Sequence, residues 1–430
     1  MEFEVIEQTY PEDFRKDLTK ELSEHLNKRD SVVFIGMRRV GISNYLRFFL
    51  YHKKLKARFT GKPGHLFIPV DLNDLVERTV FPFWVLTLKR ISDSVAGGEF
   101  DPKTKKYIET LFLDGIQSKS LFLLIENIKK ALNKILEEGV YPTIFFIRFD
   151  RISEAASAEF IANLEGVKDA TNNKLAFVFT TSRGLNSISP KVFSHTSLSL
   201  AESEMFLEPA GRADLKIICD AYIKRFGLHI SEELEAELIN LTGGYIQYLQ
   251  LALIALNEPD THIKNPKDLL GYLLRDERIN LQSEELWEDL NSSEQQILLK
   301  VLNNQKLNDK DLKENKYLLD SGFLTPKLKI FSPVFESFLH IKNEAGEGSN
   351  GKIELSKKEH LLFTYLKENL GEICEREAII EAVWPEEEAL GVSDWAIDRL
   401  VARLRKKIKE EGEFEIVTVK TRGFKLISKN

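Results

Sequence analysis

A glycine-rich loop lies near the start of the chain, from Gly36 to Ser43. It reads GMRRVGIS and fits the phosphate-binding pattern GxxxxGK[ST], except that Ile42 stands where the pattern has lysine. The apolar run SVVFIG precedes the loop and a helical pattern follows it, which is the context that the motif requires. Backbone amides at a helix N-terminus can hold an anion, and the hydroxyl of Ser43 could ligate magnesium. Isoleucine cannot supply the ammonium group that would reach the β- and γ-phosphates.

Short apolar segments alternate with helical patterns around this loop, over residues 1–202. The segments rich in Val, Ile and Phe are 31–36, 65–72, 141–150 and 174–182. Runs of this kind are typical of parallel strands that are buried on both faces of a sheet. Helical patterns between them include SNYLRFFLYHKKL, PFWVLTLKRISDSV and LFLLIENIKKALNKILEEG. The alternation predicts a doubly wound, parallel α/β sheet.

Four further segments follow the α/β module. Residues 203–280 have a helical pattern, and residues 284–342 resemble a winged helix that ends in a short ribbon. Residues 343–351, NEAGEGSNG, are small and polar without periodicity, which predicts a linker. Residues 352–430 are expected to form the last domain, with a strand, three helices and a terminal hairpin.

The ordered motifs of the first 275 residues resemble the STAND-type NTPases, which are relatives of AAA+ and origin-recognition ATPases. GMRRVGISNYLR is similar to their GxRRxGKTxLL loop, FFIRFDRIS to their Walker B strand and FVFTTSR to their sensor strand. LTGGYIQYLQLAL is similar to the tGGxPxyLq segment of their helical lid. The resemblance implies a P-loop NTPase fold, a lid at 203–280 and a nucleotide site. The corresponding residues here are Gly36, Arg38, Arg39, Gly41, Ser43, Asn44, Asp150 and Arg183.

The same motifs depart from the family where catalysis needs charge. Ile42 replaces the lysine, Ile246 replaces the proline of the lid segment, and only Asp150 remains of the Walker B acids. Arg148 places a positive charge near the expected magnesium position. Because most of the electrostatic preorganisation is lost, we expect a pseudo-ATPase without catalytic residues and with absent or negligible hydrolysis. A loop arginine could partly replace the lysine, which leaves weak binding of ATP or ADP with magnesium open.

Two other interpretations of this module stay open. In a purely structural one, the glycines form a strand–helix turn, Asp150 caps a helix and Arg183 is a surface arginine. In the other, the module is an active, ATP-driven STAND or origin-recognition-like switch that assembles on DNA. Measurable ATP turnover would separate this switch from a pseudo-ATPase.

The final domain contains a helix that is rich in cations. Its apolar residues recur at helical spacing and are expected to pack inward. Six cations fall in the eleven residues 399–409, and they are expected to face mostly outward: Arg399, Arg403, Arg405, Lys406, Lys407 and Lys409. The terminal hairpin adds Lys420, Arg422 and Lys425. A basic helix and a basic wing fit major-groove entry with a second contact in the minor groove. A solvated helix end, where the macrodipole favours cations, is the structural alternative.

Over its full length this domain resembles the OmpR/PhoB-type winged-helix domain. The matching segments are LSKKEHLLFTYL, REAIIEAVW, VSDWAIDRLVARLRKKI and TVKTRGFKL. The resemblance implies that Asp394–Ile408 enters the major groove with Arg403 as the base reader, and that Lys420 enters the minor groove. The other expected DNA contacts are Arg399, Arg405, Lys406, Lys407, Thr418 and Arg422. Ala402 and Trp395 depart from the residues usual in that family.

Composition sets the remaining expectations. The net charge is −7, but DNA binding depends on where basic residues gather rather than on the total charge. The eight histidines show no Ser-His-Asp, Cys-His or metal-ligand spacing, so we predict no metal site and no other enzyme class. No stretch approaches the ~20 apolar residues of a membrane span, and the acidic N-terminus lacks a signal region. We therefore expect a cytoplasmic protein without a membrane partner.

Together, these patterns predict a transcriptional regulator that binds double-stranded DNA. The STAND-like module would serve as a sensor or scaffold, and RNA polymerase and a homodimer on tandem half-sites are candidate partners. A protein-interaction adaptor, whose last domain binds protein instead of DNA, is a third interpretation.

Overall fold

The chain folds into two compact units, Met1–Ile341 and Lys342–Asn430. A computed structural model describes residues 5–59, 64–188, 200, 202–258, 263, 265–348, 355, 357–383, 394–411, 413–419 and 422–428. In this described part of the chain, none of the helices combines the length and the apolar character that a membrane crossing needs.

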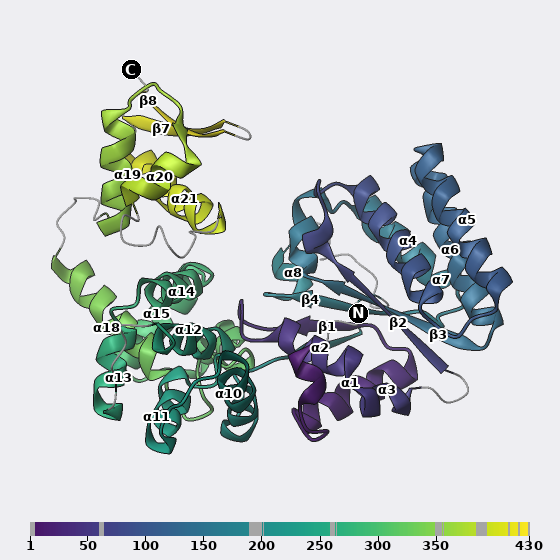
Figure 1. Cartoon of the computed structure of the whole chain (residues 1–430), viewed down its shortest axis with the longest axis horizontal. Coiled ribbons are helices and arrows are strands. Elements are labelled where there is room, and N and C mark those ends of the chain that lie inside the picture. The colour runs from purple at the N-terminus through teal and green to yellow at the C-terminus, as the bar shows by residue number, and fades with distance from the viewer. Residues whose placement is uncertain are drawn as a thin grey trace. The chain divides into compact units, whose positions relative to one another are not determined.

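A five-stranded parallel sheet is the centre of the first unit (Figure 1). Its strands, in spatial order, are β2 (Gly64–Asp71), β3 (Val140–Ile147), β4 (Ala176–Thr181), β1 (Val32–Ile35) and β5 (Ser203–Phe206). The parallel pairing confirms the predicted α/β fold. The four apolar runs became strands, but the fifth strand was missed because SEMF is short and half polar. The predicted boundary at residue 202 is therefore wrong, since residues 203–206 belong to the sheet.

Helices cover both faces of this sheet (Figure 1). One face carries η1 (Ile6–Thr9), α1 (Lys16–Lys28), α2 (Ile42–Tyr51) and α3 (Lys53–Arg58). The other carries α4 (Val80–Ala96), α5 (Pro102–Ser118), α6 (Leu121–Glu137) and α7 (Ala158–Asp169). Short helical segments follow three strands: η2 (Leu72–Asp74), η3 (Phe149–Ala155) and α8 (Leu185–Ile188). Strand residues alternate between two apolar cores, so that Val32 and Phe34 join one core while Val33 and Ile35 join the other.

A helical region completes the first unit and shares one of these cores. Its helices are α10 (Arg212–Phe226), α11 (Glu232–Thr242), α12 (Ile246–Leu256), α13 (Pro266–Leu273) and α14 (Glu277–Glu288). A winged-helix-like segment follows, with α15 (Ser292–Leu302), α16 (Asp309–Glu314), α17 (Tyr317–Asp320) and α18 (Pro333–Gly348). The expected ribbon is reduced to a single bridge between Leu324 and Ile330. The expected linker at 343–351 begins inside a helix, because α18 continues to Gly348.

The second unit is a winged helix, as predicted. It contains α19 (Lys357–Glu368), β6 (Cys374–Glu375), α20 (Arg376–Val383), α21 (Asp394–Glu411), β7 (Phe414–Val419) and β8 (Gly423–Ser428). The strands form an antiparallel sheet in the order β6-β8-β7. Leu400, Leu404 and Ile408 of α21 are buried in its core, as their spacing predicted. The expected first strand lies almost entirely outside the described residues.

Candidate nucleotide site and DNA-binding surface

The loop at 36–43 joins β1 to α2, in the strand–loop–helix arrangement of a phosphate-binding loop. Both glycines are required by close packing. A Cβ atom on Gly36 would lie 2.9 Å from the Val40 side chain and 3.0 Å from the carbonyl oxygen of Leu207. Gly41 has a φ of +120°, and a Cβ atom there would lie 2.2 Å from Cδ1 of Ile246. Ile246, at the start of α12, therefore packs directly on the loop.

Arg148 lies beside Ser43, the loop hydroxyl that could ligate magnesium. β3 ends just before it, and its left-handed backbone (φ 59°) is fixed by a 2.7 Å hydrogen bond from its N–H to Thr180 Oγ1. Its guanidinium forms an ion pair with Asp71 at the end of the neighbouring strand. It also donates to Ser43 Oγ at 3.3 Å. The hydroxyl available to a magnesium ion thus accepts a hydrogen bond from a fixed cation, which opposes binding of a second cation at this point.

The two loop arginines point toward acids of the helical region. Nε of Arg38 lies 2.8 Å from Asp289 Oδ1, and Nε of Arg39 lies 3.3 Å from Glu285 Oε2. The hydroxyl of Tyr245 donates to the backbone carbonyl of Arg38 at 2.6 Å. Because the side chain of Glu285 is only 6% exposed, its charge is held against the loop rather than in solvent. Carboxylates of this chain therefore pair with the cations that could have replaced the missing lysine.

Arg183, the candidate sensor residue, is also engaged. It forms a bidentate pair with Glu294, at 2.7 and 2.9 Å, and donates to the carbonyl oxygen of Asp289 at 2.5 Å. Its guanidinium lies 3.7 Å from the ring centroid of Tyr317. The alternative that Arg183 is a surface arginine is wrong, since its side chain is 18% exposed. It links the end of β4 to the winged-helix-like segment.

Asp150 lies near this charge cluster, whereas Asn44 does not. Asp150 is in the first turn of η3, so the prediction that it caps a helix is wrong. Burial raises the pKa of Asp150, and the positive charge of Arg38 opposes that rise. The amide of Asn44 is buried and donates to Glu7 Oε1 at 3.0 Å and to Tyr10 Oη at 3.1 Å. Asn44 is thereby committed to the interior and is removed from the candidate nucleotide site.

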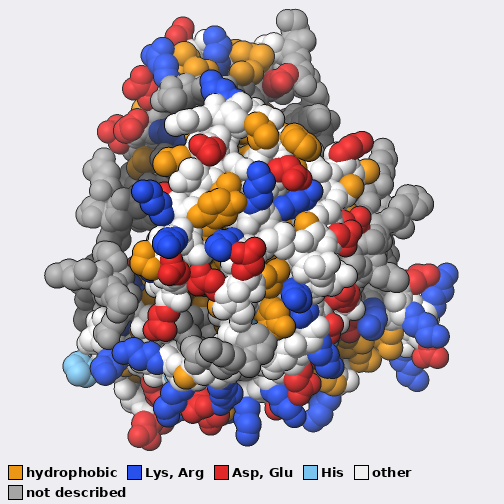
Figure 2. Space-filling model, turned by 90° about the vertical axis from the view of Figure 1, so that its right-hand side faces the viewer, with side chains coloured by type: hydrophobic (Ala, Val, Ile, Leu, Met, Phe, Trp, Pro, Cys, Tyr) orange, Lys and Arg blue, Asp and Glu red, His pale blue; other side chains and the backbone are white. Residues whose placement is uncertain are grey.

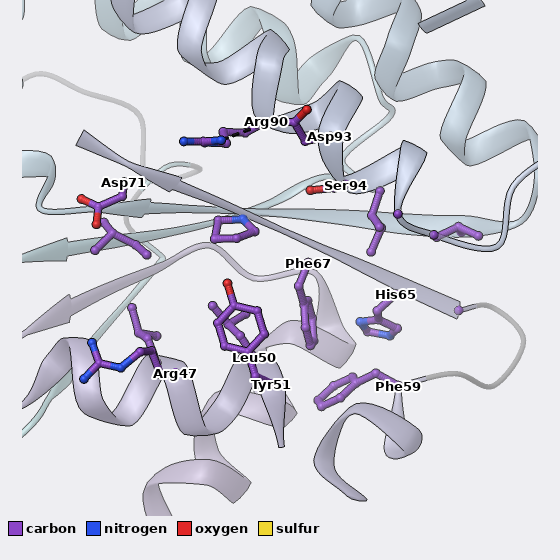
Figure 3. Close-up of a pocket in the computed structure, with 18 of the residues that line it drawn as sticks. Arg47, Leu50, Tyr51, Phe59, His65, Phe67, Asp71, Arg90, Asp93 and Ser94 are labelled. Carbon is purple, nitrogen blue, oxygen red and sulfur yellow. Dashed lines mark hydrogen bonds and ion pairs between the residues drawn. The ribbon is translucent and has the colours of Figure 1, made fainter. Parts of the chain in front are cut away.

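A groove of about 1090 Å³ runs along the edge strand β2, and Ser43, Asp71 and Arg148 line one end of it. Figure 3 shows α2 on one side of β2 and α4 on the other, with aromatic side chains toward the far end. Each arginine that lines the groove has a carboxylate partner: Arg47 pairs with Glu7, Arg90 with Asp74, and Arg148 with Asp71. The groove therefore adds no unpaired arginine that could bind phosphate.

Sequence reasoning missed the acids of this site: Asp71, Glu285, Asp289 and Glu294. The pairing of Asp71 could have been predicted from the sequence. Asp71 ends β2 and Arg148 follows β3, and the carboxyl ends of these neighbouring parallel strands meet at one edge of the sheet. The acidic stretch EELWEDLNSSE, at 284–294, carries the opposite charge to the RR pair of the loop, but its spacing does not reveal which residues meet.

In the second unit, Arg403 is not an exposed base reader. Its side chain is 7% exposed, and its Nε lies 3.7 Å from Oε1 of Glu359 on α19. Lys407 donates to the other oxygen of the same carboxylate at 2.6 Å. Both cations lie on the side of α21 that meets α19, one turn apart. The prediction that Arg403 is exposed to DNA is therefore wrong, and both cations tie α21 to α19, while the side chain of Lys407 stays 35% exposed.

The expected backbone contacts Arg405 and Thr418 bond to each other. Arg405 donates to Thr418 Oγ1 and to the carbonyl oxygen of Ile416, both at 2.9 Å, which ties α21 to β7. Arg422 stays exposed and lies 3.6 Å from Glu375. Arg399 and Lys406 belong to α21, but their side chains and all of Lys420 lie outside the described residues. Ala402, between them in the helix, is exposed.

Comparison with known proteins identifies the last domain. Residues 350–426 match the family described as "Transcriptional regulatory protein, C terminal". This match confirms the OmpR/PhoB-type winged-helix domain that the sequence motifs predicted. No curated protein matches the chain.

Several solved structures are similar to this chain at low identity. A Walker-type ATPase of Pyrococcus abyssi is 16% identical, with 78% of this chain and 100% of that chain covered and a TM-score of 0.49. The ORC1 protein of Aeropyrum pernix, in complex with DNA, is 12% identical over 98% of this chain and 90% of that chain, with a TM-score of 0.41. The ORC2 protein of Aeropyrum pernix is 13% identical over 81% and 98%, with a TM-score of 0.46.

Proposed function

We propose that this protein is a cytoplasmic, DNA-binding transcriptional regulator whose α/β module does not hydrolyse ATP. The match of residues 350–426 to the C-terminal domain of transcriptional regulatory proteins carries the proposal. In this function the winged helix binds double-stranded DNA, and the α/β module with its helical region acts as a sensor or scaffold. RNA polymerase is the proposed protein partner at the promoter.

Two features of the first unit support a non-hydrolysing module. Arg148 and Asp71 form an ion pair beside Ser43, where a catalytic magnesium ion would have to sit. Arg38 pairs with Asp289, which positions a carboxylate against the loop that would otherwise receive phosphate. Binding of a nucleotide therefore has to break ion pairs without the lysine that would offset their loss.

DNA binding is tested by retention of genomic fragments on the full chain at low salt, followed by titration of the enriched fragments. A double variant, Arg399→Ala with Lys406→Ala, removes the two cations that flank exposed Ala402 by one turn on either side. We expect its affinity to fall, and the slope of log K against log salt to drop by roughly 0.9 for each lost phosphate contact. A Lys130→Glu variant on α6 changes an exposed charge in the other unit and serves as the control. Failure of the wild-type chain to retain any fragment would refute the proposal and favour a protein-interaction adaptor.

Nucleotide binding is tested by calorimetry with ATP and ADP in magnesium, together with phosphate release. We expect no measurable turnover and, at most, weak binding. The loop keeps both glycines of the motif between a strand and a helix, and this favours the alternative function, an ATP-driven switch on DNA. Micromolar binding with steady turnover would establish that switch and refute the non-hydrolysing module.

A further inference from the structure

The hairpin of α5 and α6 carries several exposed apolar side chains, of which Tyr107 and Leu113 lie on the outer face of α5. In the described part of the chain, Tyr107, Leu113 and Ile116 of α5 and Phe122 and Leu123 of α6 are 40–71% exposed. Figure 2 faces this side of the α/β module and shows apolar side chains between charged ones. Nearly half of the large apolar residues found exposed in the described chain thus belong to one helical hairpin, which is typical of an interaction surface.

The exposed stripe of α5 is symmetric about Thr110. Residues at positions 103, 106, 107, 110, 113, 114 and 117 are all exposed and lie on one face of the helix. Counting outward from Thr110, Tyr107 and Leu113 occupy equivalent positions, and so do Lys106 and Asp114. The central threonine is small, and its hydroxyl already donates to the carbonyl oxygen of Lys106 at 2.9 Å. Another helix could therefore approach closely there without leaving that hydroxyl unsatisfied.

We propose that α5 is the contact surface between two copies of this chain, which cross antiparallel with a twofold axis at Thr110. In this arrangement Lys106 of each copy lies at the same height along the interface as Asp114 of the other, within reach of a long side chain, and Tyr107 and Leu113 line the two flanks. A twofold interface requires that one patch be complementary to itself, and the reversed charges at ±4 residues from the centre meet that requirement. A partner of another sequence would not require this symmetry.

The hairpin is built to present this face rigidly. Asp101 accepts a hydrogen bond from the N–H of Lys103 at the start of α5, and Ser120 caps the start of α6. On the inner side, a Cβ atom on Gly115 would lie 2.9 Å from Leu124 Cδ1, so the two helices are in close contact. The stripe therefore belongs to a packed hairpin, and dimerisation would order few additional groups.

The expected dimer is weak, because α5 is only about 25 Å long and a pair of such helices buries less than a standard interface. We expect a dissociation constant on the order of tens of micromolar in free solution. Two copies bound at neighbouring DNA half-sites would be held at a high effective concentration and would pair more completely. The surface is thus suited to dimers that form on DNA.

Charge reversal tests the proposal on the full chain by sedimentation over a concentration series. Lys106→Glu and Asp114→Lys each place like charges opposite one another twice per dimer, so each variant should dimerise at least tenfold more weakly than the wild type. Mixing the two variants restores opposite charges at both contacts, and we expect heterodimers at wild-type affinity. The double variant Lys106→Glu with Asp114→Lys should also recover self-association.

The controls separate this interface from other outcomes. Lys130→Glu changes an exposed charge of α6 outside the stripe and should leave the dissociation constant unchanged. All the positions are exposed, so unchanged thermal unfolding should show that each variant folds. The proposal is overturned if the wild type stays monomeric at concentrations tenfold above the expected dissociation constant. It is also overturned if both single variants dimerise as the wild type does, or if their mixture does not.

Discussion

Removal of the Arg403 side chain should destabilise the winged helix rather than change only its sequence preference. The carboxylate of Glu359 is 1% exposed, and the Nε atom of Arg403 lies 3.7 Å from it. At an effective dielectric constant of about 20, this attraction amounts to about 4 kcal/mol. Lys407 keeps a 2.6 Å hydrogen bond to the same carboxylate after the change, which reduces the loss. We therefore expect Arg403→Ala to lower the free energy of unfolding of this domain by about 2–3 kcal/mol.

Hydrogen exchange on the full chain measures this loss of stability within the winged helix itself. Amides of α21 that exchange through unfolding of the domain should exchange about 30- to 150-fold faster in Arg403→Ala. Arg422→Ala is a matched control, because the pair between Arg422 and Glu375 is 60% exposed on both sides and should contribute less than about 1 kcal/mol. Our reasoning is refuted if Arg403→Ala leaves exchange unchanged while it alters which DNA sequences are bound.

Three further predictions concern the first unit. Gly41→Ala should lower the free energy of unfolding by about 2–3 kcal/mol, because φ is +120° and Ile246 blocks the added carbon. Adding Ile246→Ala should recover only part of this loss in chemical denaturation. Full recovery would show that backbone strain is absent. Burial raises the pKa of Asp150, so the ionised carboxylate destabilises the folded state at high pH and this destabilisation is relieved as the pH falls. Asp150→Asn should therefore stabilise the protein at pH 8 but not in acid. A variant that is destabilised at pH 8 would mean that the attraction of Asp150 to nearby arginines outweighs its burial. Burial, together with the charge of Arg29, lowers the pKa of His65 to about 4. Stability should therefore be lost as the pH falls from about 6.5 toward 4, because the unfolded chain takes up a proton that the folded chain does not. Between pH 7 and pH 4.5, His65→Gln should lose less unfolding free energy in denaturation than the wild type, and an equal loss would contradict the shift.

The sequence alone determined the order of the elements and the classes of the two units. The apolar runs were long enough to identify four of the five strands of the parallel sheet. The loop glycines were recognisable because their spacing and context are local properties. The spacing of Leu400, Leu404 and Ile408 likewise located the buried face of α21. The motifs of residues 352–430 were sufficient to predict the winged helix that residues 350–426 match.

Tertiary structure alone decided what each charged side chain contacts. Arg148 and Asp71 lie 77 residues apart in sequence, and Arg183 and Glu294 lie 111 apart. Helical spacing placed Arg403 beside the buried face of α21, but only the packing of α19 brought Glu359 into reach and turned an expected DNA contact inward. Buried faces can be predicted from spacing along the chain, because burial of an apolar side chain is favourable whichever residue it packs against. An ion pair needs two residues at one point in space, and that meeting depends on how whole elements pack.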